Sequence, residues 1–65
     1  MTNIQTHFHL KQRYWANLGL MQFYIESNKF NHAIFHYLIS LTIRDEIFEN
    51  FDKLAKDQKY YIGWL

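Results

Sequence analysis

Apolar residues recur along this chain at the spacing of helices, and residues 30–43 show this most clearly. The stretch contains no Asp, Glu, Lys or Arg. Its apolar positions share one face of a helix, and they are Phe30, Ile34, Tyr37, Leu38 and Leu41. A helix with so apolar a face must be covered, and the flanking segments are the available covers. We therefore expect the rest of the chain to be organised around this stretch.

A first helix is predicted over about residues 6–26, before a turn signal at Ser27 and Asn28. Gly19 lies inside this helix, where it costs up to about 1 kcal/mol relative to Ala. We expect close approach of a facing helix at Gly19 to compensate. The apolar stripe of this helix consists of Leu10, Tyr14, Leu18, Met21 and Ile25.

The remaining residues allow two interpretations. One helix could run from residue 30 to about residue 61, with a seam repeating every seven residues at Ile34, Leu41, Phe48 and Ala55. Alternatively, a helix over 30–43 ends before another over 45–61. We favour the break, because Thr42 and Asp45 resemble a capping box and acidic residues cluster where the second helix would start.

The predicted fold class is therefore all-α, a helical hairpin plus a third helix (about 6–26, 30–43 and 45–61), in one domain spanning residues 1–65. A chain of 65 residues is near the lower limit for an unaided hydrophobic core. Its residues are 49% hydrophobic and 20% aromatic, which exceeds what so small an interior can bury. We expect dimerisation to complete the core.

Trp15, Leu18 and Gly19, followed by Ala33 and Tyr37, resemble one tetratricopeptide repeat. In that family, Trp, Leu and Gly mark the first helix, and Ala with an aromatic residue four positions later marks the second. The family consists of stacked helix–turn–helix units that bind peptide segments of partner proteins. Here no Pro closes the unit. The resemblance implies a helical hairpin with Gly19 at the contact between its helices.

Composition excludes several classes of protein. A net charge of +1 is too small to argue for nucleic acid by itself, and the lack of cysteine rules out disulfides and thiolate metal sites. The uncharged runs 14–25 and 30–43 are shorter than the ~20 residues that span a bilayer. The first residues have neither the basic start nor the apolar run of a signal peptide. We expect a cytoplasmic protein.

Candidate chemistry is sparse. No cysteine nucleophile, glycine-rich phosphate loop or serine elbow is present, so we predict that the chain is not an enzyme and uses no cofactor. His32 and His36 share a helix face at the spacing that suits two metal ligands, and His7 and His9 could complete a four-nitrogen site. We interpret all four as ordinary half-exposed histidines, with no metal.

The expected function is that of a small regulatory or adaptor protein that acts through protein–protein interaction. Its partner would be another protein, a second copy of the chain, or both. Compact, cysteine-free chains of this kind are common among small regulators of bacteria and their phages. Aromatic residues dominate interface energies, and the candidate protein-binding residues are Tyr14, Trp15, Tyr60, Tyr61 and Trp64.

The alternative is a dimeric helical module that binds nucleic acid. Small hairpin dimers bind RNA along one face, and this chain carries basic residues near aromatic ones. The candidate residues for this function are Lys11, Arg13, Lys29, Lys53, Lys56 and Lys59.

Overall fold

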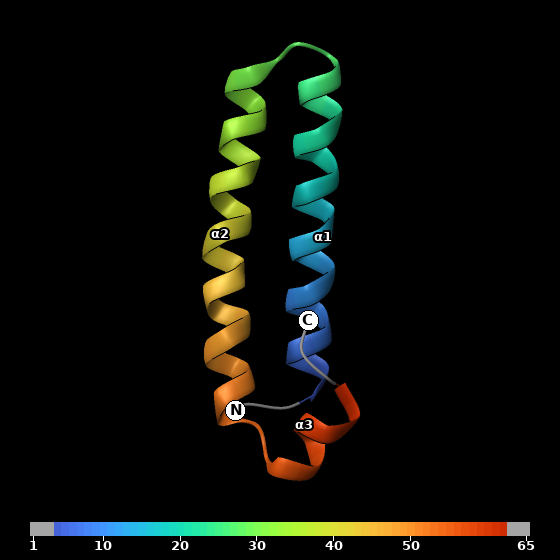
Figure 1. The fold of residues 1–65 in the computed structure, drawn as a ribbon, viewed down its shortest axis with the longest axis vertical. Coiled ribbons are helices and arrows are strands. Elements are labelled where there is room, and N and C mark those ends of the chain that lie inside the picture. The colour runs from blue at the N-terminus through green and yellow to red at the C-terminus, as the bar shows by residue number, and fades with distance from the viewer. Residues whose placement is uncertain (1–3, 63–65) are drawn as a thin grey trace.

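The computed structural model describes residues 4–62, which form three helices and no strand: α1 (Ile4–Glu26), α2 (Phe30–Lys53) and α3 (Lys56–Ile62). Figure 1 shows α1 and α2 side by side and antiparallel, with α3 beside the end opposite their connection. We call the end at residues 27–29 the turn end and the opposite end the open end. The predicted all-α hairpin with a third helix is confirmed.

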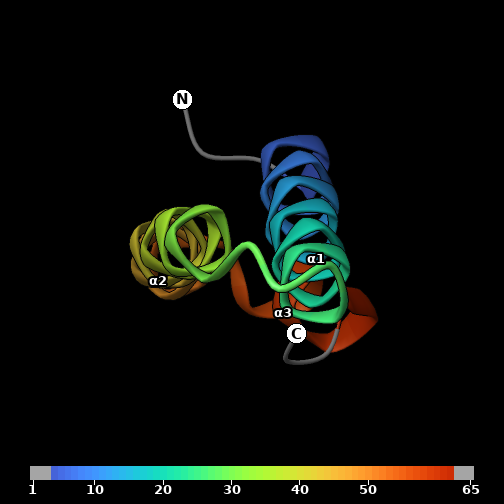
Figure 2. The ribbon, with the colours of Figure 1, turned by 90° about the horizontal axis from the view of Figure 1, so that it is seen from above.

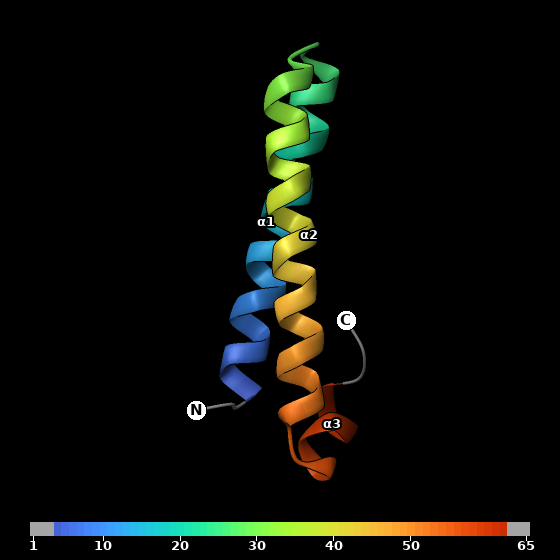
Figure 3. The same ribbon diagram turned by 90° about the vertical axis from the view of Figure 1, so that its left-hand side faces the viewer.

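The molecule is a rod with principal extents of 44 × 16 × 15 Å. Figure 3 shows that the two long helices cross at a shallow angle and that α3 lies at the open end of the pair. Figure 2, seen from above, shows most of α3 beneath α1 and not beneath α2. Within residues 4–62, neither long helix is apolar enough along its length to cross a membrane.

Burial on both long helices follows alternating steps of three and four residues, the spacing of a coiled coil. We call these positions the seam. On α1 the seam consists of His7, Leu10, Tyr14, Asn17, Met21 and Tyr24. On α2 it consists of Ala33, His36, Ser40, Ile43, Ile47, Asn50 and Leu54, the last directly after the helix. Every one of these residues is buried or half-buried.

The apolar core occupies the half of the seam towards the open end. Leu10, Ile43 and Ile47 form its centre, with Tyr14 and Ile39 packed against them. Ile47 is fully buried and Ile43 is 2% exposed. Towards the turn end, the seam is instead made largely of polar and aromatic side chains. The hairpin therefore has one half with an apolar interior and one half without.

The prediction that the stripe of residues 30–43 faces the core is wrong. Phe30, Ile34 and Leu38 are each 55–56% exposed, and Tyr37 is 45% exposed. The actual seam is displaced by one residue from the predicted repeat, so that Ala33 and not Ile34 faces α1. The reason is that α2 is one continuous helix. Burial of its apolar side chains near the open end fixes the rotation of the whole helix.

The predicted break between residues 43 and 45 is also wrong, as is a single helix to residue 61. α2 continues to Lys53 and ends where Leu54 adopts an extended conformation with ψ of 150°. The Thr42 hydroxyl donates back to the Leu38 carbonyl at 3.3 Å inside the helix instead of capping a new one. The side chain of Gln58 accepts from the Ala55 N–H at 3.2 Å, which is half of a capping box for α3.

The turn predicted at Ser27 and Asn28 is present. Asn28 has φ of 59°, a left-handed conformation that Asn tolerates better than most residues. The Lys29 N–H donates to the Tyr24 carbonyl at 2.8 Å, and the Asn28 N–H donates to the Ile25 carbonyl at 3.1 Å. These hydrogen bonds close the last turn of α1 and direct the chain back along it.

Gly19 does not lie at the helix contact, contrary to the prediction. It is exposed, and a Cβ built there meets no atom within 4 Å apart from its own helix neighbours. It lies midway between the seam residues Asn17 and Met21 in the seven-residue pattern. Gly19 is therefore on the side of α1 that points away from α2. Gly19 therefore costs helix stability without a compensating contact in the hairpin.

Gly19→Ala should raise the free energy of unfolding by about 0.5–1 kcal/mol, because Ala loses less backbone freedom in a helix. Urea unfolding followed by circular dichroism measures this. Ala16→Gly is the matched control, since Ala16 is also exposed on α1, and it should lower stability by a similar amount. A loss of stability in Gly19→Ala would contradict the exposed position.

Candidate protein-binding face

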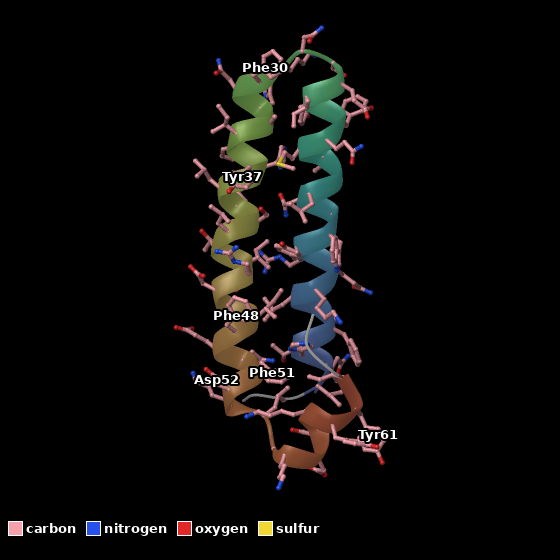
Figure 4. The ribbon with its side chains drawn as sticks, viewed as in Figure 1. Phe30, Tyr37, Phe48, Phe51, Asp52 and Tyr61 are labelled. Atoms are coloured by element: carbon pink, nitrogen blue, oxygen red, sulfur yellow. The ribbon has the colours of Figure 1, made fainter. Side chains whose placement is uncertain are left out.

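Large apolar side chains from both long helices gather on one side of the hairpin. Except for Met21 and Phe30, which line a groove in the face, each lies one residue after a seam position, so it flanks the seam on the same side. We call this set the outer apolar face. Met21 is itself a seam residue that reaches the face. The face consists of Phe8, Trp15, Leu18, Met21 and Ile25 of α1 with Phe30, Ile34, Tyr37 and Leu41 of α2. Figure 4 labels Phe30 and Tyr37 along α2.

A groove opens in this face near the turn end. Its volume is about 250 Å³, and it is lined by Met21, Ile25, Phe30, Ala33, Ile34 and Tyr37. Small-molecule sites are typically larger, roughly 300–1,000 Å³, and carry several polar groups that orient the ligand. The only polar side-chain atom in this lining is the Tyr37 hydroxyl. The groove therefore suits an apolar side chain of a protein partner better than a small metabolite.

Charged residues border the outer apolar face at both ends of the hairpin, with Glu26 and Lys29 beside the turn. No charged residue occurs in the segments 14–25 and 30–43, which form all of this face except Phe8. Lys11 and Arg44 flank the seam on the same side, below these segments. The uncharged half of the hairpin is thus also the half whose seam lacks an apolar core.

At the open end, the same side of the hairpin is covered by α3. The Lys59 ammonium lies 5.3 Å from the centre of the Phe51 ring and donates to the Asp52 carbonyl at 3.3 Å. Phe51 follows the seam residue Asn50, so it belongs to this side (Figure 4). The chain therefore covers one end of this side with its own third helix and leaves the other end exposed.

Towards the turn end, histidine and tyrosine rings hold the two helices together. The Tyr24 ring stacks on His32 at 5.0 Å between ring centres and on His36 at 5.5 Å, with interplanar angles of 28° and 10°. His36 Nδ1 lies 3.0 Å from Asn17 Oδ1. The Asn17 amide donates to the Arg13 carbonyl at 2.9 Å, which orients its oxygen towards His36. Because that oxygen only accepts, His36 Nδ1 carries the proton in this contact.

The four histidines do not form a common site. His7 is buried near the open end with its ring centre 6.1 Å from that of Phe51, whereas His32 and His36 pack on Tyr24 near the turn end. The ten residues from His7 to Asn17, the partner of His36, correspond to about 15 Å along a helix. Among residues 4–62, no group of three or more potential ligands is placed to hold a metal ion.

The predicted protein-binding residues divide between three places. Trp15 is 56% exposed on the outer apolar face, while its neighbour Tyr14 is half-buried in the seam, with ring centres 5.2 Å apart. Tyr60 and Tyr61 are more than 80% exposed on α3. Trp64 lies outside the described residues. The side chains lining the groove were missed, because the apolar stripe was assigned to the core.

The predicted nucleic-acid-binding residues are not brought together on one surface. Lys29 lies at the turn end, whereas Lys53, Lys56 and Lys59 lie at the open end of a rod 44 Å long. Lys11 and Arg13 flank the seam of α1 on opposite sides. Lys59 already contacts the Phe51 ring within the chain.

Comparisons with protein families, with curated proteins and with solved structures find no match for this chain. The geometry also differs from a tetratricopeptide unit. Here α1 and α2 have 23 and 24 residues, whereas both helices of such a unit fit within about 34 residues. The function must therefore be argued from the surface of the molecule.

Tyr24→Ala should lower the free energy of unfolding by about 1–3 kcal/mol more than Phe23→Ala, because Tyr24 makes two ring contacts across the hairpin. Phe23 is the matched control, being an aromatic neighbour that is 59% exposed. Urea unfolding of the two variants measures the difference. Equal losses would show that the histidine stack does not hold the turn end.

Proposed function

We propose that this chain is a small, non-enzymatic regulatory or adaptor protein that acts through protein–protein contacts made by its outer apolar face. The observation that carries the proposal is the continuity of this face between Trp15 and Ile25 on α1 and between Phe30 and Leu41 on α2. It crosses both helices, contains no charged side chain over segments 14–25 and 30–43, and presents rings that are about half exposed. Exposed apolar patches of this extent mark interaction sites in soluble proteins.

The composition of the face also favours protein binding. Interface energy concentrates in a few aromatic side chains that become fully desolvated. Trp15, Phe30 and Tyr37 are 45–56% exposed on this face, so each has apolar surface left to bury. The groove beside Phe30 and Tyr37 offers a concave element into which a partner side chain fits. Rings next to a groove are the arrangement that anchors a partner.

The lining of the groove supports a binding role over catalysis. Its six residues include no carboxylate, imidazole, amine or thiol, the groups that act most often as acid, base or nucleophile. The nucleic-acid alternative remains a prediction with less support, because the basic side chains are scattered. Lys29 lies at the turn end and Lys53, Lys56 and Lys59 lie at the open end, with the large uncharged region between them.

The test is affinity capture from the native host with the full-length chain as bait, with and without nuclease. Any captured protein is then purified and titrated against wild type, Trp15→Ala and Phe23→Ala. The two aromatic side chains are similarly exposed, at 56% and 59%, but only Trp15 belongs to the outer apolar face.

Trp15→Ala should weaken binding by roughly 30-fold or more, the effect of losing an interface anchor, while Phe23→Ala binds as wild type does. Circular dichroism should show unchanged helicity in both. Equal binding by the two variants would remove the outer apolar face from the function. Capture of nucleic acid alone, with affinity falling steeply as salt rises, would support the alternative.

A further inference from the structure

We infer that the occupant of the outer apolar face is a second copy of this chain, and that two hairpins form an antiparallel four-helix bundle with their turns at opposite ends. The inference rests on the proposed function, in that it names the protein bound at the same face. Three features of the chain carry it: the size of its interior, the area of the face and the distribution of charge.

The interior of one hairpin is small. Within residues 4–62, the buried apolar side chains are Leu10, Ala33, Ile43, Ile47 and Leu54. Only Ala33 of these lies in the half towards the turn end. Chains of this length rarely reach a stable fold on so few buried groups without a metal, a disulfide or association. Cysteine is absent, and a second copy is the one partner present wherever the chain is made.

The area of the face matches what one partner contributes to a stable interface. Six of its side chains are 45–56% exposed: Phe8, Trp15, Ile25, Phe30, Ile34 and Tyr37. A half-exposed ring presents on the order of 100 Å². With the half-buried members of the face included, the surface to be covered is on the order of 700 Å², close to the roughly 800 Å² per partner of a standard interface.

Charge determines the orientation. Lys11 and Arg44 lie on the side of this face, below its uncharged part. If the two turns pointed the same way, these cations would oppose the same cations of the second copy, which is unfavourable. Turns at opposite ends separate them. This orientation is isologous, so each contact occurs twice.

The antiparallel orientation also gives the groove an occupant. The two copies would be related by a two-fold axis perpendicular to the rod. If this axis crosses α1 near Leu18, it lies about midway between Trp15 and the groove residues Met21 and Ile25. The axis therefore sets Trp15 of one copy opposite the groove of the other, and the reverse. An exposed indole would thus be buried in an uncharged recess on both sides of the bundle.

Sedimentation equilibrium of the full chain over nanomolar to micromolar concentrations tests the inference. Wild type should approach twice the monomer mass of 8.1 kDa. Ile34→Glu should weaken dimerisation by 30-fold or more, because it places a charge in the interface. Phe35→Glu should dimerise as wild type does, since Phe35 is similarly exposed (59% against 56% for Ile34) but flanks the seam on the other side.

Single cysteines test the same contact if Ile34→Glu also unfolds the chain. The sequence has no native cysteine, so any disulfide is assignable. Tyr37→Cys lies close to the expected two-fold axis and should give a disulfide-linked dimer under mild oxidation. Its neighbour Leu38 is exposed on the side of α2 that points away from α1, outside the outer apolar face. Leu38→Cys should therefore stay monomeric in denaturing gels.

A wild-type chain that stays at 8.1 kDa and folds would overturn the inference, as would equal dimerisation of the Ile34 and Phe35 variants. These failures are distinguishable from failure of the proposed function. A monomer that binds a captured protein through Trp15 would overturn only the second copy as occupant. A monomer whose Trp15→Ala variant binds every partner unchanged would overturn both.

Discussion

The rotation of α2 about its own axis is the constraint on which the rest of this structure depends. Ile43 and Ile47 are almost completely buried against α1, and Leu54 closes the same seam at 5% exposure. A continuous helix cannot present one face in its first half and another in its second. Burial near the open end therefore decides that Ala33, His36 and Ser40 face α1 near the turn, and that the apolar stripe beside them faces outwards.

Polar residues in the turn half of the seam make specific contacts. Ser40 donates to the Tyr37 carbonyl at 2.6 Å, and His36 pairs with Asn17 while stacking on Tyr24. Polar groups at seam positions define register at a cost in stability. The contacts of His36 with Asn17 and Tyr24 also link the two helices where no apolar core does. The apolar surface that a simpler hairpin would bury inside is thereby left on the outer apolar face.

Much of the fold was predictable from the sequence, because helical spacing and turn chemistry are local. The hairpin, its turn at Asn28 and the three-helix order are examples. The register was not predictable in this way, since the predicted repeat at Ile34 and the actual one at Ala33 differ by a single residue. The prediction followed the repeat through Ile34 because its residues near the turn are the more apolar. The actual repeat starts at Ala33 and leads through Ile47 and Leu54, which are buried near the open end.

The missed helix end and the exposed Gly19 have similar causes. Thr42 has the chemistry of a cap, but its hydroxyl bonds inside the helix, and α2 stays helical as far as residue 53 with its seam side packed on α1. Gly19 was interpreted as a packing contact because close approach of a facing helix would compensate for its cost to the helix. Its neighbours Leu18 and Leu20 flank the seam instead of filling it, which leaves Gly19 on the side of α1 that points away from α2.

The two halves of the hairpin therefore differ in how much apolar surface they bury inside. Towards the open end, Leu10, Ile43 and Ile47 form a core, charged residues occupy the surface, and α3 covers Phe51. Towards the turn end, ring stacking holds the helices while larger apolar side chains remain outside. If a partner covers the outer apolar face as proposed, that contact supplies apolar burial that the turn half lacks. Binding to the folded hairpin would then stabilise that half by mass action.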